Sequence, residues 1–485
     1  MSARAVEPTE ALVRWAPRLG LRDGVVLQAV AGGDATLTFP GGRVTVRSPT
    51  VGVRAGLHAL RDGATHDEVA DAAQAAERTV DLARLYLIVE RLLARGLLAP
   101  SVVVGERAAL TAVPIAPDFA WRPNPVGLDT PHRLSRFAFW RRRDEALVIE
   151  SPLSLARTVV RDGPAAGIVG ELARASTPRD LAERTGVDEA SCAACIGLLA
   201  AVELAGAVDR DGRLPEDDDD RLAQYDFHDL LFHTRSRRGR SDEPSGATFR
   251  FVDRIPPEPA TKAPMSERAT DLYAPDLECV AADDPPFTTV LERRSSVRAH
   301  GGRPIAASEL GEFLYRAARV RTVEPIDVER GLLYETTSRP YPSGGATYDL
   351  ELYVTVRECD GIHPGLYHYD PLGHRLFLVS DDPRVVDGFV HDAWLACAQA
   401  VLPQVVITLA SRFPRLAWKY SGMAYAATLK NVGVLFQTMY LVATAMGLAP
   451  CALGNGDASR LSRATGIDPF TELSVGEFML GSAPE

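Results

Sequence analysis

The first half of the chain repeats one pattern of local structure. The segments that start at Val44 and Leu147 each open with an alternating apolar strand and reach a Ser-Pro pair, at Ser48 in the first and Ser151 in the second. Each then continues through three helix-like runs, the last of which ends in an apolar stripe. A pattern that recurs at this length is typical of one supersecondary unit present twice. We therefore expect two successive small α+β domains.

A strand followed by three helices and a terminal hairpin is the winged-helix pattern, which binds either DNA or peptide. The third helix of the first copy carries Asp81, Arg84 and Glu90 rather than a basic cluster, and the whole chain has a net charge of −11, which repels phosphates. We expect two tandem winged-helix-like units, residues 1–104 and 130–210. They either bind peptide or only cover a face of the remaining chain, and no nucleic-acid partner is expected.

Length and composition place the chain among multidomain globular proteins. It has 485 residues, of which 46% are hydrophobic and 24% charged. Residues 1–20 build no apolar core of a signal peptide, which predicts no secretory signal and a cytoplasmic protein. The six cysteines are scattered and indicate reduced thiols; Cys192 and Cys195 match C-x-x-C without a second pair, so no metal site is expected.

Residues 211–285 differ in composition from the rest. An acidic run, a basic run and a group of prolines predict an extended linker on the surface. Within it, Phe227–His233 has the spacing of a short amphipathic helix, and its histidines have no third ligand at metal spacing, which favours a packing role.

The remaining residues, 286–485, have a mixed α/β pattern. Strands are predicted at 349–356, 365–369, 376–379 and 405–410. Residues 431–456 carry no charge, but polar residues interrupt them and no basic cluster flanks them, so we expect a buried helix rather than a membrane span.

Three segments of this last domain carry chemistry. Arg294, Ser296 and Arg298 fall on one side of an extended segment after a helix, where guanidinium and hydroxyl groups suit a phosphate. The turn 339–346 has two prolines that fix its shape and two glycines whose backbone can approach a flat ring. A second glycine loop lies at 453–457, and no Rossmann or P-loop motif is present.

Lysine is scarce. Of the 53 basic residues only three are lysines, Lys262, Lys419 and Lys430. Arginine cannot release its proton at ordinary pH, whereas a buried lysine can. Each lysine is therefore a candidate proton acceptor.

In chain order, L-x-x-R-x-S-x-R at 291–298, P-S-x-G at 342–345 and the late glycine loop resemble the flavin-binding signature of the nitroreductase superfamily, over residues 286–481. More narrowly, the chain resembles the SagB-type azoline dehydrogenases of ribosomal peptide biosynthesis. The segments that carry this resemblance are Phe232–His233 with Ser236–Arg237, Gly365–Tyr369 and Trp418–Tyr420. The resemblance implies an α+β, nitroreductase-like FMN domain after the two repeated units.

The resemblance also implies a homodimer with FMN at the subunit interface. It assigns the phosphate and ribityl contacts to Arg294, Ser295, Ser296 and Arg298, and the ring contacts to Pro342, Ser343 and Gly344 of the partner subunit and to Leu453 and Gly454. It makes Lys419 and Tyr420 the catalytic pair. The sequence departs from the pattern at His300, where an aromatic residue is usual, and at its end, Glu485, where many relatives have a basic tail. Arg460 or Arg463 is therefore a candidate for a further phosphate ligand.

The implied reaction oxidises a thiazoline or oxazoline in a peptide to the aromatic azole. A base removes the ring Cα proton while the flavin accepts a hydride, with dioxygen as the expected final acceptor. The implied partners are a heterocyclised precursor peptide and a cyclodehydratase complex; no membrane is involved. Two alternatives stay open: a flavin reductase or nitroreductase that acts on a free small molecule, which leaves the repeated units without a task, and a non-catalytic peptide-binding scaffold.

Overall fold

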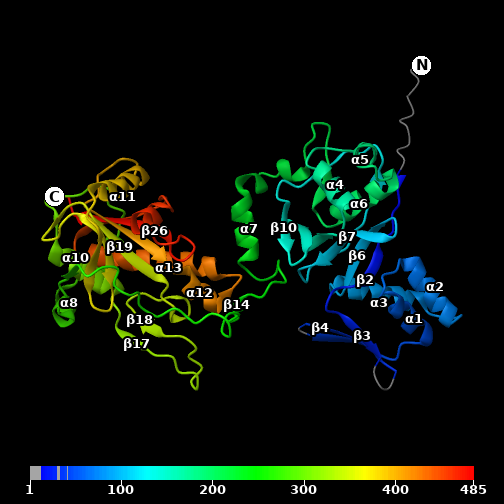
Figure 1. The fold of residues 1–485 in the computed structure, drawn as a ribbon, viewed down its shortest axis with the longest axis horizontal. Coiled ribbons are helices and arrows are strands. Elements are labelled where there is room, and N and C mark those ends of the chain that lie inside the picture. Colours follow the sequence, from blue (N-terminus) through cyan, green and yellow to red (C-terminus); the bar gives the residue numbers. More distant parts are fainter. Residues whose placement is uncertain (1–11, 30–32, 41, 485) are drawn as a thin grey trace, which may run out of the picture. The chain divides into compact units, whose positions relative to one another are not determined.

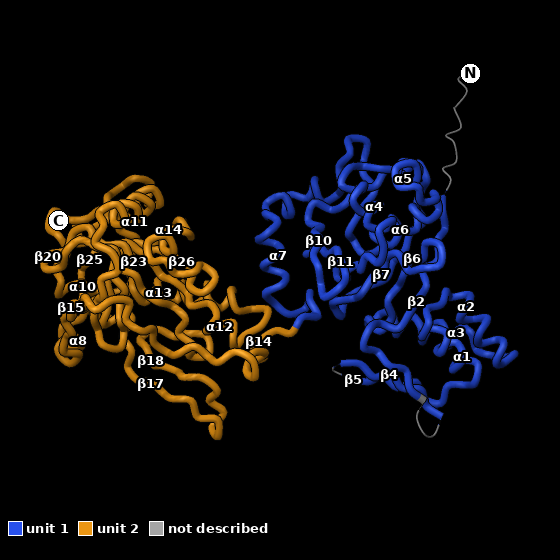
Figure 2. Tube along the Cα trace, in the orientation of Figure 1, with its two compact units in different colours: residues 1–243 blue, residues 244–485 orange. Residues whose placement is uncertain are grey.

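The computed structural model describes residues 12–29, 33–40 and 42–484. They form two compact units, 1–243 and 244–485, which we describe separately (Figure 2). The boundary between the units lies inside the predicted linker. The first eleven residues, which contributed to the prediction that no secretory signal is present, lie outside the described residues.

The first unit contains one arrangement of elements twice. The first copy consists of β2 (Arg18–Leu21), β3 (Val26–Ala29), β4 (Ala35–Phe39), β5 (Gly42–Val46), α1 (Val51–Ala59), α2 (His66–Ala76), α3 (Leu82–Ala94) and β6 (Leu98–Val104). The second consists of β9 (His132–Leu134), β10 (Phe139–Arg143), β11 (Ala146–Glu150), β12 (Ala156–Val160), α4 (Gly163–Glu171), α5 (Pro178–Thr185), α6 (Glu189–Ala201) and β13 (Ala205–Ala207). Between the copies lies β7 (Arg107–Pro114), and β1 (Leu12–Val13) pairs with β8 (Val126–Gly127).

The two copies agree in the details of their helix ends. Thr65 caps α2 and Thr177 caps α5, each through a reciprocal capping box with the third helical residue. After the third helix, the amide of Leu97 donates to the carbonyl of Leu92 (3.0 Å), and that of Leu204 donates to Leu199 in the same way (2.9 Å). These matches define the correspondence between copies residue by residue. The winged-helix assignment of the copies stays a prediction.

The structure corrects the alignment of the repeat. Ser48 and its proline directly precede α1, whereas Ser151 and its proline precede the strand β12. The two Ser-Pro pairs are therefore not equivalent. A residue before proline avoids the helical conformation, so a Ser-Pro pair ends regular structure wherever it occurs. Its recurrence therefore does not show which residues of the two copies correspond.

The sheets of the two copies are joined differently. One six-stranded sheet has the order β10-β11-β12-β7-β6-β2, so that β7 pairs antiparallel with β12 of the second copy. In the first copy, β3-β4-β5 form a separate three-stranded sheet that ends at β5. Each copy has its own apolar core, around Leu57 and Val89 in the first and around Ile168 and Ile196 in the second.

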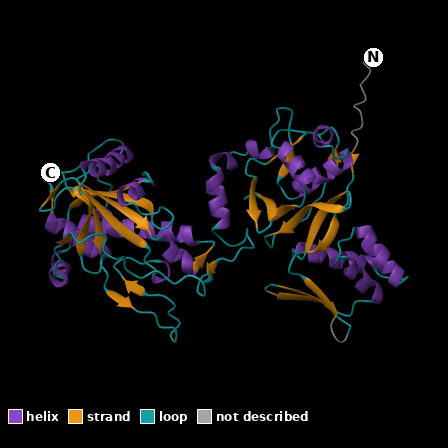
Figure 3. Ribbon diagram, viewed as in Figure 1, coloured by secondary structure: helices purple, strands orange, loops and turns teal. Residues whose placement is uncertain are grey.

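The second unit is a seven-stranded sheet between two helical layers (Figures 1 and 3). The strands, in the order β15-β22-β21-β19-β23-β26-β25, are β15 (Ala269–Asp271), β22 (Arg375–Ser380), β21 (Gly365–Asp370), β19 (Leu350–Val356), β23 (Val405–Ser411), β26 (Leu473–Ser482) and β25 (Leu448–Leu453). The helices are α8 (Leu277–Asp283), α9 (Phe287–Arg293), α10 (Ala307–Ala318), α11 (Pro383–Ala396), α12 (Phe413–Lys419), α13 (Ala424–Ala445) and α14 (Arg460–Thr465).

The central strand β19 shows how the layers are separated. Leu352 and Val354 lie in the core formed with α10 and α13. Tyr353, between them, lies with Phe389 of α11 and Leu461 of α14 on the opposite face, as strand alternation requires. The four strands predicted after residue 349 are confirmed, each within one residue of its predicted ends.

The predicted helix at 431–456 is partly wrong. The helix α13 begins earlier, at Ala424, and ends before Gly447, whose φ of +68° closes it. The residues after Gly447 form β25, and Pro450 is compatible with this strand because β25 lies at the edge of the sheet, where no ladder partner needs its N–H. In the described residues we find no helix with the length and apolar character needed to cross a bilayer.

The predicted linker is more structured than its composition indicates. Its amphipathic helix is present as α7 (Phe227–Arg235). Its later part belongs to the second unit, where β14 (Gly246–Ala247) pairs with β24 (Tyr420–Ser421) and β15 forms one edge of the main sheet. This part of the chain builds the second unit rather than only leading to it.

The long helix α13 makes the second unit sensitive to its buried face. We expect Leu435→Ala to destabilise this unit by about 2–5 kcal/mol, because the fully buried side chain leaves a cavity below the sheet. Leu429→Ala on the same helix is the matched control, since Leu429 is 40% exposed. Differential scanning calorimetry should show a lowered transition for Leu435→Ala and little change for the control; equal transitions would contradict this account of the core.

Candidate functional site

Lys419 is the last residue of α12 and is held by the segment 244–260, which we call the covering segment. Its backbone carbonyl accepts hydrogen bonds from the amides of Thr248 (3.0 Å) and Phe249 (3.1 Å). The neighbouring Trp418 is buried and donates from its indole Nε1 to the carbonyl of Ile255 (2.6 Å). The covering segment therefore fixes the end of α12 from outside.

The amine of Lys419 is half-buried among aromatic rings. Its Nζ donates to the hydroxyl of Tyr334 at 2.6 Å. It also lies 5.2 Å from the ring centre of Tyr420 and 5.8 Å from that of Phe249, within the range of cation–π attraction. The lysine and tyrosine singled out from the sequence are thus neighbours at one site, and the amine does not extend into bulk solvent.

Tyr334 connects Lys419 to a backbone carbonyl. Its hydroxyl donates to the carbonyl oxygen of Gly345 (2.5 Å), and only 7% of the residue is exposed. Burial raises the pKa of Tyr334, so its phenol keeps the proton that this hydrogen bond needs. Sequence reasoning missed Tyr334 because it lies outside every motif and reaches the site through tertiary structure.

The glycine loop approaches Lys419 closely. Gly345 has a φ of +63°, and a Cβ added there would collide with Nζ of Lys419 and lie 2.6 Å from the hydroxyl of Tyr420. Only glycine combines this left-handed backbone with the absence of a side chain. The structure therefore places the predicted turn 339–346 beside the predicted catalytic pair, with Gly345 rather than Gly344 at the point of closest approach.

A buried carboxylate anchors the loop. Asp349 is fully buried and accepts hydrogen bonds from Ser411 (2.7 Å), Thr428 (3.0 Å) and the side-chain amide of Asn431 (2.7 Å). The oxygen of the Asn431 amide in turn accepts from the backbone N–H of Gly344 (3.0 Å). The loop is thus tied to β19, β23 and α13 together, which makes its position rigid.

Arg415 packs beneath the same loop. Its guanidinium is buried and donates to the backbone carbonyls of Glu258 (2.5 Å), Glu335 (2.6 Å) and Thr347. Burial lowers its pKa to about 10, and the charges of Arg412 and Arg339 act in the same direction. Arg415 joins the covering segment to the glycine loop.

The predicted phosphate ligands form a second cluster at the other end of α13. Ser296 hydrogen-bonds the hydroxyl of Tyr440 (2.8 Å), and the guanidinium of Arg294 lies 5.3 Å from the centre of that ring. The backbone N–H of Val297 donates to Pro450 (2.8 Å) at the outer edge of β25. The segment is extended, but the structure assigns it to no strand, which corrects the strand alternation used to select its residues.

This second cluster has unpaired positive charge. Arg294 and Arg298 form no ion pair with a carboxylate in the part of the chain that the structure describes, and Ser295 is exposed beside them. Two guanidinium groups without acidic partners suit a bound anion. Leu453 is buried at the end of β25, and Gly454 follows it in an exposed loop.

Arg460 and Arg463 do not fit as further phosphate ligands. Arg460 is already paired with Asp392 (2.8 Å), and Arg463 with Asp457. His300 is half-buried and packs against Gly481; desolvation, followed by the charge of Arg357, lowers its pKa to about 4, which favours a neutral ring. The unpaired cations of this cluster are therefore Arg294 and Arg298.

The two clusters lie along one helix. Asn431 contacts the glycine loop, and Tyr440, nine residues further along α13, contacts the arginine segment. At 1.5 Å per residue they are about 13 Å apart along the helix axis. Lys430, one of the three candidate proton acceptors, lies on the same helix but is exposed, so the structure does not support a role for it at this site.

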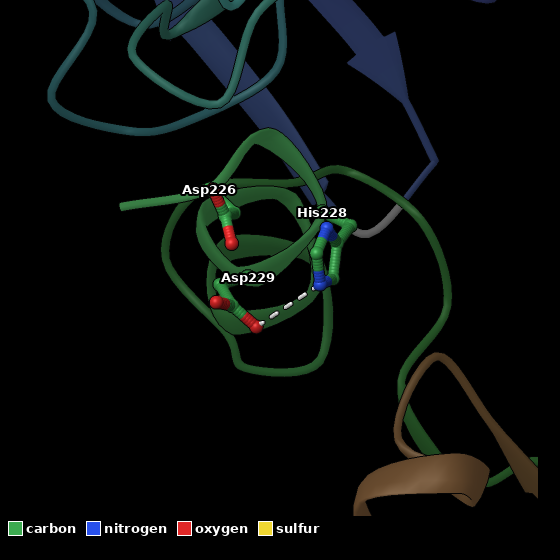
Figure 4. Close-up of side chains that lie close together, drawn as sticks. All are labelled: Asp226, His228 and Asp229. Carbon is green, nitrogen blue, oxygen red and sulfur yellow. Dashed lines mark ion pairs between the residues drawn. The ribbon is translucent and has the colours of Figure 1, made fainter. Parts of the chain in front are cut away.

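A group of possible metal ligands lies in the first unit. Ligand atoms of Asp226, His228 and Asp229, at the start of α7, lie within 4.8 Å of one another (Figure 4). Asp226 and Asp229 were not predicted from the sequence as companions of His228. All three side chains are exposed, and His228 already pairs with Asp229 at 3.6 Å, so we assign them no metal.

Comparisons with known proteins agree with this division of the chain. The model of the nitroreductase family matches residues 291–482. A nitroreductase-like protein of Methanocaldococcus jannaschii (MJ1384) is 31% identical over 189 residues, which are 38% of this chain and 83% of that protein. The chain belongs to the nitroreductase family. In the first unit, the model of cyanobactin oxidase ThcOx matches residues 132–242, the second copy of the repeat with α7.

Solved structures with similarity include a nitroreductase-family protein of Ralstonia eutropha JMP134, at 20% identity and a TM-score of 0.34, which covers 50% of this chain and all of that one. They also include a chain of the Escherichia coli microcin synthetase McbBCD complex with truncated pro-MccB17, at 20% identity and a TM-score of 0.32, over 47% of this chain and 90% of that one. The resemblance found in the sequence is confirmed by the two family models and the M. jannaschii relative.

The close approach at Gly345 gives a prediction that needs no substrate. Gly345→Ala should displace the side chain of Lys419 and increase its rate of acetylation, because the added Cβ occupies the position of Nζ. Gly331→Ala is the matched control, with a φ of +77° but no neighbour within 4 Å of the added atom. Peptide mapping after acetic anhydride treatment resolves the three lysines; unchanged labelling of Lys419 in Gly345→Ala would contradict the described geometry.

Proposed function

We propose that the protein is an FMN-dependent azoline dehydrogenase that converts thiazolines or oxazolines of a heterocyclised precursor peptide to azoles. Membership of the nitroreductase family supports the redox chemistry, and the match to the cyanobactin oxidase model supports a ribosomal peptide as substrate. The observation that carries the proposal is the half-buried amine of Lys419, held by Tyr334 beside a glycine loop. A nitroreductase acting on free small molecules has no evident need for this amine.

The residues present fit FMN. Arg294 and Arg298 provide unpaired guanidinium groups for its phosphate, with Ser295 and Ser296 as hydroxyl donors beside them. Leu453 and Gly454 follow at the neighbouring end of β25. When bound, FMN would supply the two-electron acceptor that azole formation requires.

Lys419 is the proposed base that removes the ring Cα proton. In its uncharged form Nζ can donate one hydrogen to the hydroxyl of Tyr334 and direct its lone pair elsewhere. The proton of Tyr334 is occupied by the carbonyl of Gly345, so Tyr334 serves as a hydrogen-bond acceptor for Lys419 and fixes its direction. Tyr420 provides a second hydroxyl at the same place and orients the substrate ring in this proposal.

The geometry constrains how a dimer would build the site. Gly345 contacts Lys419 in the same chain, so the glycine loop and the lysine are positioned together. We propose a homodimer in which Pro342, Ser343 and Gly344, together with Lys419, face the flavin held by Arg294 and Arg298 of the other protomer. We further propose dioxygen as the final electron acceptor and a cyclodehydratase as a partner that supplies the azoline.

The decisive experiment follows the mass of a heterocyclised precursor peptide. Each oxidised ring should lose about 2 Da, in an FMN-dependent reaction that yields hydrogen peroxide. Lys419→Ala should retain flavin but lose at least about 100-fold in rate, the range of one general base. Lys430→Ala, an exposed lysine on α13, is the matched control. A flavin-loaded Lys419→Ala with full turnover would refute the role of the lysine, and no mass change in wild type would refute the reaction.

Tyr334 is a positioning residue in this scheme. Tyr334→Phe should lower kcat by about tenfold, or ~1.4 kcal/mol, with little change in KM. The reason is that Lys419 is still present but loses the hydroxyl that accepts its hydrogen bond. The pH dependence of kcat should shift with it, which loss of stability alone would not cause. Tyr273→Phe, whose parent side chain is 53% exposed, is the control. A normal pH profile with normal kcat would remove Tyr334 from the mechanism.

A further inference from the structure

Phe249, on the covering segment, has a backbone conformation that a bulky residue rarely adopts. Its φ is +49°, in the left-handed region that favours glycine. An unfavourable conformation of this kind persists only where the surrounding structure imposes it, and such residues cluster at functional sites. The contacts of Phe249, through its amide and through its ring, show what imposes it here.

The backbone of Phe249 binds the end of α12. Its amide and that of Thr248 both donate to the carbonyl of Lys419, at 3.1 and 3.0 Å. The residues just before them form β14, in which Ala247 lies opposite Tyr420 of β24 (Figure 1). The left-handed turn follows this strand pairing directly, so the ring of Phe249 leaves the covering segment beside Lys419.

The ring of Phe249 forms one wall around the amine of Lys419. Its centre lies 5.8 Å from Nζ, and the ring packs edge-on against that of Trp418, with the two centres also 5.8 Å apart. Tyr334 and Tyr420, whose rings lie 5.0 and 5.2 Å from Nζ, carry hydroxyl groups. Phe249 carries no polar atom on its side chain. It therefore excludes water from this side without offering the amine another hydrogen-bond partner.

Buried charge fixes the far end of the covering segment. The guanidinium of Arg412 forms an ion pair with Glu258 (3.1 Å) and donates to the carbonyl of Pro259 (2.6 Å). At the near end the segment is held by the pairing of β14 with β24. A segment that is fixed on both sides can hold an unfavourable φ at a residue between them, as it does at Phe249.

We propose that Phe249 is a positioning residue of the active site, whose ring keeps the amine of Lys419 against Tyr334 and closes this side of the site to solvent. The covering segment is then a wall of the catalytic site as well as a support for α12. A base that removes a proton from carbon needs a lone pair that is directed at the proton and is not bound to water. That the shielded amine acts on an azoline rests on the proposed function; the shielding itself does not.

The alternative role for Phe249 is purely structural, with a ring that only covers the apolar face of Trp418. This role predicts lower thermal stability and unchanged access of a reagent to Lys419. The wall predicts changed access at Lys419 and not at the other lysines. The comparison can be made within one chain, because Lys262 is ion-paired and Lys430 is exposed.

The test measures acetylation of the full-length, substrate-free protein by acetic anhydride, with peptide mapping of the three lysines. Phe249→Ala should raise the labelling of Lys419 relative to Lys430 by at least about threefold, because the reagent reaches Nζ once the ring is removed. Phe251→Ala is the matched control. It removes the same side chain two residues further along the covering segment, where the ring lies under the guanidinium of Arg250 (4.6 Å).

A second variant separates the ring from the backbone. Phe249→Gly lacks the ring but adopts the left-handed φ without strain, so the covering segment keeps its path. It should expose Lys419 to acetylation as much as Phe249→Ala does. Thermal unfolding of each variant, followed by circular dichroism, reports separately on any loss of stability.

Turnover provides a measurement that depends on the proposed function. With a heterocyclised peptide as substrate, Phe249→Ala should lower kcat by about tenfold and leave KM within about twofold of wild type, because the amine loses its fixed position while substrate binding remains. The flavin content should equal that of wild type. Phe251→Ala should retain normal kcat.

Unchanged relative labelling of Lys419 in Phe249→Ala and Phe249→Gly would overturn the proposal. A lower melting temperature without a change in labelling would do the same, since it would assign the ring a structural role. An equal gain in labelling for Phe251→Ala would show general loosening of the covering segment and would also refute it. If labelling changes as expected but wild type oxidises no azoline, the proposed function fails and the role of Phe249 as a wall is retained.

Discussion

The hydrogen bonds from Lys419 through Tyr334 to the carbonyl of Gly345 are the constraint on which the candidate site depends. They join the end of α12 to the glycine loop, and the loop is fixed in turn by Asn431 and the buried Asp349. A lysine side chain loses up to about 2 kcal/mol of conformational freedom when it is ordered. Its position beside the loop is therefore a property of the surrounding packing, and most of that packing lies in sequence segments far from the lysine.

Local patterns were sufficient to predict the main elements of the second unit. Alternating apolar residues predicted β19, and a continuous apolar run predicted β23. Both predictions succeeded because these strands are central in the sheet, so that their apolar residues are the buried ones. The family motifs predicted Lys419, Tyr420 and the glycine loop as site residues, and in the structure Gly345 of this loop lies against both side chains. The same patterns failed at residues 448–453, because an uncharged run fits a buried helix and a buried strand equally well, and only the left-handed Gly447 separates them.

Tertiary relationships could not be read from local patterns. Tyr334 and Arg415 act through contacts with residues 11 and 68 positions away, and neither lies in a recognisable motif. The repeat was visible in the sequence, but its register was not, because the Ser-Pro pairs mark chain breaks and not equivalent positions. The correct register follows from the helix caps Asp81 and Asp188, which align Arg91 of α3 with Leu198 of α6.

The covering segment also bears on where the redox domain begins. The nitroreductase model starts at residue 291, yet β14 and β15 lie before it, and both pair with strands of the second unit. A recombinant fragment cut at the family boundary would lose the amides that hold the carbonyl of Lys419 and would leave the edge of β22 unpaired. The physical start of the domain is near residue 244, so expression trials and homology searches that rely on the family boundary would work with an incomplete and aggregation-prone sheet.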